Sequence, residues 1–142
     1  MGAGRGGGIR NSVSPWDGRV RCRAVVTLVR DHGACVIALT IDEEGMARTA
    51  GRKLEVARRI RDLARDEFEL QPHQLIFDAL TFTLATGEAE WIDSAHETID
   101  GIRAIKRELP GVLTVLCVSN VSFGLAPPTR PIFTSVFLHP CI

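Results

Sequence analysis

Two apolar segments of the chain each end at a polar side chain that could bind a ligand. Residues 75–77 are followed by Asp78, and residues 114–118 are followed by Ser119 and Asn120. Loops rich in threonine, serine and glycine come next in both cases. Because ligands of α/β proteins bind outside the carboxyl ends of the strands, we expect the function to lie at these two positions.

The two residue types indicate what kind of ligand would fit. A carboxylate accepts two N–H donors, whereas an asparagine amide both donates and accepts. Asn11 lies at the carboxyl end of another short segment that could end a strand, residues 9–12. Asn11, Asp78 and Asn120 on one rim would suit a pterin- or purine-like ring. The rim has no Ser-His or Cys-His pair and no metal-ligating cluster, so we expect neither a covalent nucleophile nor a bound metal.

Each of these residues also has a purely structural interpretation. Asp78 could cap the turn that follows its strand, and Asn120 could hold the turn at residues 119–122 through backbone bonds. The acidic segment Asp42, Glu43 and Glu44 is expected to be a solvated loop. The sequence alone leaves these alternatives open.

The hydrophobic pattern alternates between strands and helices. Buried strands are expected at residues 9–12, 34–40, 75–78 and 112–118. Amphipathic helices are expected at residues 16–32, 49–68 and 90–109, and a last helix is expected from about Pro131 to the end of the chain. The long crossovers predict parallel strands and an α/β fold. The spacing fits either a small doubly wound sheet or half of an eight-stranded β/α barrel.

Bulk properties narrow the class of protein. The 142 residues suffice for one domain, expected at residues 9–142 after a flexible glycine-rich leader at residues 1–8. The 17 basic and 17 acidic residues balance, which gives no general attraction to nucleic acid or anionic membranes. The apolar runs are too short to span a bilayer, and the amino terminus lacks the apolar stretch of a signal peptide. The four cysteines show no C-x-x-C spacing. We therefore expect a cytoplasmic protein.

Several longer segments occur together in a family-specific order. They are A-L-T-I-D-E-E-G-M-A at residues 38–47, L-I-F-D with L-T-F-T-L-A-T-G at residues 75–87, L-P-G leading into S-N-V-S-F-G-L at residues 109–125, and S-V-F-L-H at residues 135–139. With these segments the sequence resembles the pterin-binding (folate-binding) domain of cobalamin-dependent methionine synthase. The strings S-N-V-S-F-G-L and T-F-T-L-A-T-G favour this family over related corrinoid-folate methyltransferases.

The resemblance implies a partial TIM-type β/α barrel with about four parallel strands and crossover helices. In the family, 5-methyltetrahydrofolate binds at the carboxyl ends of the strands, and its methyl group passes from N5 to cob(I)alamin on another domain and on to homocysteine. By residue type and motif, Asn120 would approach N5, whereas Asp78 and Asn11 would hold the pterin. Arg130 looks like the basic residue that follows the S-N-V-S-F-G-L loop.

Some positions depart from the family pattern. Ala79 stands where the family usually has proline, and Cys117 stands where it has glycine. The early and late barrel strands are also lacking, so the expected partners are folate, the missing barrel half, and the cobalamin-binding and homocysteine-binding modules. The alternatives are a non-catalytic folate-binding module and an inactive truncated product.

Overall fold

The computed structural model describes residues 9–13, 19–84 and 93–142, with side chains described from Arg23 onward within these ranges. The expected leader at residues 1–8 lies outside the described residues. The expected starts of the first and third helices, at residues 16–18 and 90–92, also lie outside them.

A parallel sheet of four strands forms the centre of the fold. The strands are β1 (Ile9–Val13), β2 (Cys35–Leu39), β5 (Leu75–Asp78) and β6 (Leu113–Val115), in the spatial order β1-β2-β5-β6. All three pairings are parallel, and the strands lie side by side in the order of the sequence. A doubly wound sheet reverses its order at a switch point, whereas a β/α barrel adds each strand next to the previous one. The fold is therefore the α/β arrangement of a partial TIM-type barrel, as predicted.

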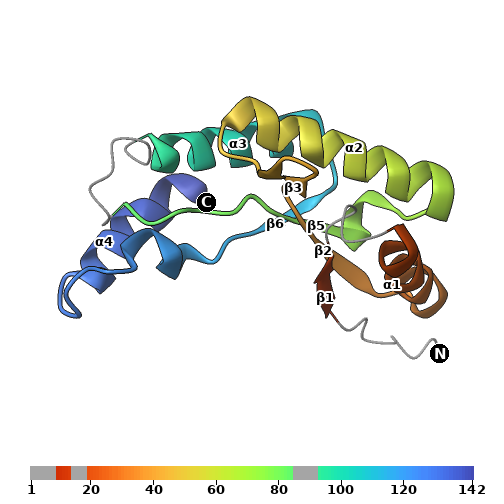
Figure 1. Ribbon diagram of the computed structural model, residues 1–142, viewed down its shortest axis with the longest axis horizontal. Coiled ribbons are helices and arrows are strands. Elements are labelled where there is room, and N and C mark those ends of the chain that lie inside the picture. The colour runs from red at the N-terminus through yellow and green to blue at the C-terminus, as the bar shows by residue number, and fades with distance from the viewer. Residues whose placement is uncertain (1–8, 14–18, 85–92) are drawn as a thin grey trace, which may run out of the picture.

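Helices connect the strands in the expected places. They are α1 (Arg19–His32), α2 (Ala50–Phe68), α3 (Ser94–Glu108) and α4 (Arg130–Leu138). Figure 1 shows α2 and α3 lying side by side above the sheet, with α1 and α4 at its opposite ends. The last helix is shorter than expected, because it ends at Leu138 and a 3-10 turn, η4 (His139–Cys141), follows. Pro140 has no N–H with which to continue the helical hydrogen bonds.

Two other segments differ from the sequence expectation. The predicted loop after β2 contains a small antiparallel hairpin of β3 (Ile41–Asp42) and β4 (Gly45–Met46). Strand β6 ends at Val115, three residues earlier than predicted. Val115 pairs with Asp78, the last residue of β5, so the neighbouring strand offers no backbone partner beyond this point.

Helix α2 has defined signals at both ends. The Thr49 hydroxyl accepts a hydrogen bond from the Arg52 amide (3.3 Å), which satisfies one of the free donors of the first turn. Glu69 adopts the left-handed conformation (φ 56°) after the last turn, and the Leu70 amide then donates to the Ala64 carbonyl (3.1 Å). These caps fix where α2 begins and ends.

The two faces of the sheet differ in their surroundings. The side chains packed against the helices form the core and are buried, among them Val36, Ala38, Leu75 and Phe77. On the opposite face, Leu113 and Val115 are 49% and 39% exposed. This second face corresponds to the interior of a closed barrel, where further strands would cover it. Within the described residues no helix is long and apolar enough to cross a membrane.

Truncating Phe77 tests the core assignment. Phe77 is fully buried between the sheet and the helices, so Phe77→Ala should lower the free energy of unfolding by about 3–4 kcal/mol through lost burial and a residual cavity. Phe123→Ala is the control, since Phe123 is 68% exposed and should cost less than about 0.5 kcal/mol. Urea unfolding curves measure both changes. Similar losses for the two variants would contradict the assignment.

Candidate functional site

Three parallel strands end at one rim of the sheet. Asp78 closes β5 and lies in register with Leu39 of β2 and Val115 of β6. Because side chains alternate along a strand, Asp78 lies on the face opposite to buried Phe77. That face is the one that a complete barrel would enclose. The half-buried Asp78 carboxylate therefore lies at the mouth of the partial barrel.

The described contacts of Asp78 hold one oxygen of its carboxylate and leave the other without a hydrogen-bond donor. Its Oδ1 accepts a hydrogen bond from the Leu80 amide (2.9 Å), and its backbone carbonyl accepts from the amide and the hydroxyl of Thr40 (3.1 Å each). The turn-capping interpretation of Asp78 is thus confirmed for one oxygen. Among the described residues nothing donates to Oδ2, so this oxygen can still accept a hydrogen bond from a ligand. Burial raises the pKa of Asp78, and the Leu80 hydrogen bond and the charge of Lys53 oppose the rise.

Asn120 lies in a 3-10 turn, η3 (Val118–Ser122), that follows β6. Its backbone N–H donates to the Cys117 carbonyl (3.1 Å), and its backbone carbonyl accepts from the Phe123 N–H (3.1 Å). The backbone thus holds the turn, as the structural interpretation expected. The Asn120 side chain is exposed, and the only partner that the described residues give it is the Cys117 thiol, which lies 3.5 Å from Oδ1. A thiol is a weak donor, so most of the hydrogen-bonding capacity of this amide is available.

The loops that carry Asp78 and Asn120 run side by side. The Leu84 amide donates to the Val121 carbonyl (3.2 Å), and the Thr83 hydroxyl donates to the Phe123 carbonyl (2.6 Å). These bonds join the segment after β5 to the turn after β6. The structure therefore brings the two predicted regions together at the same end of the sheet.

For the other two predicted residues, Arg130 and Asn11, the structure describes fewer contacts with this end of the sheet. Arg130 begins α4, where its Nε donates to the Ser122 hydroxyl over 3.5 Å, and Thr134 donates to the same hydroxyl (3.0 Å). Arg130 thus lies against the turn that contains Asn120. Asn11 belongs to β1, in the strand next to β2, but the side chains of this strand are not among those described. Its contact with a ligand stays a prediction.

Lys53 is a further polar residue of this region that sequence reasoning missed. It projects from α2, is completely buried, and donates to the carbonyls of Ala47 (2.9 Å), Ala79 (2.6 Å) and Leu80 (3.0 Å). Burial lowers the pKa of its amine to about 8, and the negative charges of Asp78 and Glu97 oppose this shift. The amine is therefore still a cation at neutral pH.

One signal in the sequence could have found Lys53. It stands three residues before Val56 and four before Ala57, so it shares the apolar stripe of α2. A lysine on such a stripe must either extend to solvent or find acceptors inside the protein. The carbonyls that accept its hydrogen bonds belong to other segments of the chain, and no residue type in the sequence marks them as acceptors.

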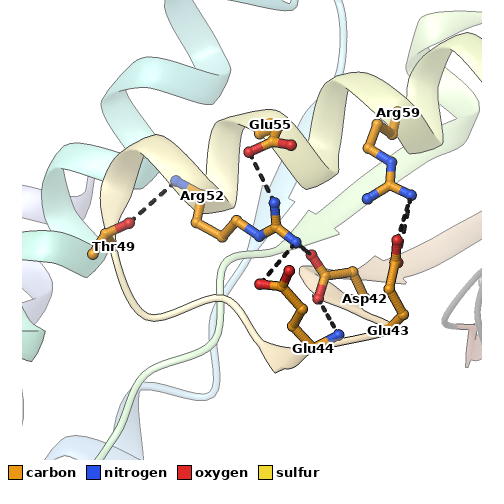
Figure 2. Close-up of polar contacts among 7 residues, drawn as sticks. All are labelled: Asp42, Glu43, Glu44, Thr49, Arg52, Glu55 and Arg59. Atoms are coloured by element: carbon orange, nitrogen blue, oxygen red, sulfur yellow. Dashed lines mark hydrogen bonds and ion pairs between the residues drawn. The ribbon is translucent and has the colours of Figure 1, made fainter.

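The acidic segment after β2 is only in part the solvated loop that the sequence suggested, since Glu43 and Glu44 are exposed whereas Asp42 is not. Asp42 is buried, forms an ion pair with Arg52 of α2, and accepts a hydrogen bond from the Glu44 amide (2.9 Å). Figure 2 shows that Arg52 also reaches Glu44 (3.3 Å) and Glu55 (3.0 Å). A second arginine, Arg59, binds Glu43 (3.0 Å), so two arginines of α2 hold the hairpin.

The site as a whole offers hydrogen bonds and charge. The half-buried carboxylate of Asp78 closes β5, the exposed amide of Asn120 lies in the turn after β6, and the guanidinium of Arg130 contacts that turn from the start of α4. Within the described part of the chain, no three side chains of His, Cys, Asp or Glu gather as metal ligands would. The arrangement can therefore bind and orient a polar ring, and can donate a hydrogen bond to it from Asn120.

Removing the charge of Arg52 tests how the hairpin is held. Arg52→Met should lower the free energy of unfolding by about 2 kcal/mol, because it leaves the buried Asp42 carboxylate without its cation. Arg58→Met is the matched control on the same helix, since the pair of Arg58 with Glu108 is exposed and should contribute less than about 1 kcal/mol. Chemical denaturation at neutral pH measures both values. Equal losses would contradict the distinction between the two ion pairs.

Comparison with known proteins agrees with this geometry. The family model described as "Pterin binding enzyme" matches residues 1–142, which is the whole chain. The methionine synthase of Mycobacterium tuberculosis (strain ATCC 25618 / H37Rv) is 46% identical over 134 residues, and so is that of Mycobacterium leprae (strain TN). Each alignment covers 92% of this chain but 11% of the relative, so the chain spans about a tenth of the length of these relatives. The chain belongs to the family of pterin-binding enzymes.

Proposed function

We propose that this chain binds 5-methyltetrahydrofolate at the rim formed after β5 and β6, as part of a methionine synthase. The observation that carries the proposal is the Asp78 carboxylate at the end of β5, half-buried and with one oxygen left for a ligand. The names of the relatives support the choice of substrate, since methionine synthases are 46% identical to the chain.

Asp78 would bind the edge of the pterin that carries N–H donors. An amino group and a ring N–H side by side match a carboxylate whose Oδ2 is free and whose Oδ1 keeps a second lone pair beside its bond from the Leu80 amide. Such charge-assisted hydrogen bonds are about twice as strong as neutral ones. The Leu80 amide already fixes Oδ1, so the plane of the carboxylate is set before the ligand arrives. Asn11, in the strand beside β2, would contact the same ring.

Asn120 would act at the other end of the ring system. A methyl group leaves a tertiary amine slowly while the amine is neutral, so hydrogen bonding or proton donation at N5 must stabilise the departing nitrogen. The exposed Asn120 amide can donate such a bond. Arg130, held near the same turn, would add positive charge for the negatively charged part of the folate.

The methyl acceptor and the final product belong to other parts of the proposed assembly. Cobalamin, when bound on its own domain, supplies the cobalt that accepts the methyl group, and homocysteine receives it afterwards. The exposed Leu113 and Val115 on the inner face of the sheet support a further proposed partner, the remainder of the barrel. The cytoplasmic location stays a prediction.

Changing Asp78 to asparagine tests the binding site. Asp78→Asn keeps an oxygen for the Leu80 amide but removes the charge, so affinity for 5-methyltetrahydrofolate should fall about 10- to 100-fold, the value of one or two charge-assisted hydrogen bonds. Asp100→Asn, on the exposed face of α3, is the control and should bind like the unaltered chain. Isothermal titration calorimetry measures the dissociation constants. A folded Asp78→Asn chain that binds with unchanged affinity would refute the assignment of Asp78.

Changing Asn120 separates catalysis from binding alone. If Asn120 donates a hydrogen bond to N5 as the methyl group leaves, Asn120→Ala should slow methyl transfer to added cob(I)alamin about 100-fold. The dissociation constant of the folate should change far less, because this bond strengthens in the transition state. The neighbouring exposed Ser119 gives the control variant Ser119→Ala, which should retain the rate. Single-turnover absorbance changes of the cobalamin follow the reaction. Folate binding without any transfer by the unaltered chain would favour the alternative of a non-catalytic folate-binding module.

A further inference from the structure

The buried ammonium of Lys53 connects two loops of the rim. Its three N–H donors are all used, one on Ala47 after the β3–β4 hairpin and two on Ala79 and Leu80 after β5. Phe82, from the same loop as Leu80, places its ring centroid 5.7 Å from Nζ. Lys53 thus holds the segments that follow β2 and β5 at a fixed separation.

Helix α3 is shaped to leave room for this side chain. A Cβ atom added to Gly101 would lie 2.7 Å from Cδ of Lys53, closer than two carbon atoms can approach. One turn earlier, the Thr98 hydroxyl donates to the Ser94 carbonyl (2.8 Å) and lies 3.2 Å from the Leu80 carbonyl, which Lys53 binds. The contact between α2 and α3 is therefore arranged around the lysine and the carbonyl of Leu80.

Stability alone is a weak reason for such an arrangement. An ammonium group loses its hydration when buried, and a well-packed apolar side chain of similar size often gives equal or greater stability. The consequence of burial is visible in the lowered pKa of Lys53, which the carboxylates of Asp78 and Glu97 only partly oppose. What the lysine adds is a fixed position for Ala79 and Leu80, the two residues directly after Asp78.

Leu80 is held from both of its backbone groups. Its carbonyl accepts a hydrogen bond from Lys53, with the Thr98 hydroxyl also 3.2 Å away, and its amide donates to Oδ1 of Asp78 (2.9 Å). Leu80 also adopts a left-handed conformation (φ 52°), which a non-glycine residue takes only when its surroundings impose it. A shift of Leu80 would therefore move the donor that orients the Asp78 carboxylate.

We propose that Lys53 is a positioning residue for pterin binding, which acts through Leu80 to orient the Asp78 carboxylate. This inference rests on the proposed function, since it assigns Lys53 a role in the same site. Lys53 itself touches no ligand, because its three donors are occupied by backbone carbonyls. It differs in this respect from Asp78, Asn120 and Arg130.

The first experiment needs no ligand. Lys53→Met keeps the length of the side chain and removes its charge, and Lys106→Met is the matched control, since Lys106 is the other lysine of the chain and is exposed on α3. Carbon-detected NMR follows the titration of the Asp78 carboxyl, and hydrogen exchange follows the Leu80 amide. In Lys53→Met the Asp78 pKa should rise further and Leu80 exchange should accelerate at least about tenfold, because a positive charge and an anchor are lost. Unchanged values in a folded variant would overturn the proposal.

The second experiment measures coupling to ligand binding. Lys53→Met should weaken 5-methyltetrahydrofolate binding about tenfold in the otherwise unaltered chain and less than about twofold in the Asp78→Asn background, since both changes act through one carboxylate. Equal losses in the two backgrounds would overturn the positioning role. If the unaltered chain binds no folate, the proposed function fails and the role in pterin binding fails with it, whereas the NMR result reports separately on whether Lys53 orients Asp78.

A measurement on the unaltered chain covers the case in which Lys53→Met does not fold. Raising the pH from neutral to about 10 should neutralise Lys53, whose pKa is lowered by burial, and should produce a second step in the Asp78 carboxyl signal. Hydrogen exchange at Leu80 should then accelerate beyond its intrinsic dependence on pH. In the Lys106→Met chain Lys53 is the one remaining lysine, so its own NMR signal gives the pH at which the step is expected. No change at Asp78 and Leu80 while the Lys53 signal titrates would overturn the proposal.

Discussion

The ammonium of Lys53 is the contact on which the arrangement of the rim depends. It binds one carbonyl after the β3–β4 hairpin and two after β5, and so joins the loops that follow two neighbouring strands. Asp42 and Arg52 reinforce the same region, because their ion pair holds the hairpin against α2. Two charged side chains of α2, Lys53 and Arg52, therefore connect this helix to backbone carbonyls and to the hairpin. These contacts join the loops of the rim to the core beneath them.

The sheet explains why the site lies where it does. Its strands are adjacent in sequence order, so their carboxyl ends form one edge, and the alternation along β5 puts Phe77 in the core and Asp78 on the opposite face. The same alternation leaves Leu113 and Val115 partly exposed on that face. The proposed binding residue Asp78 and an uncovered apolar surface therefore share one side of the sheet, as expected for the interior of a barrel.

Much of this could be predicted from local sequence, and the remainder depends on distant contacts. The stripe of Ala57, Ile60 and Ala64 predicted α2, and the run that ends at Asp78 predicted β5 with its last residue. The end of β6 could not be predicted, because it is set by the length of its partner strand and not by the apolar residues that continue to Val118. Asp42 was expected in solvent because its partner Arg52 belongs to the following helix. Lys53 was missed because it binds backbone carbonyls, which every residue has. Only the resemblance, not the pattern, suggested Arg130.

The central claim is that the loops after β5 and β6 bind a pterin together. The most direct measurement is a two-dimensional amide NMR titration of the chain with 5-methyltetrahydrofolate. We expect saturable shifts that are largest at Leu80 and at residues 119–121, with little change at Ile132 and Val136 on the exposed side of α4. Saturable shifts centred on Ile132 and Val136, or no shifts at millimolar ligand in a folded sample, would contradict this claim.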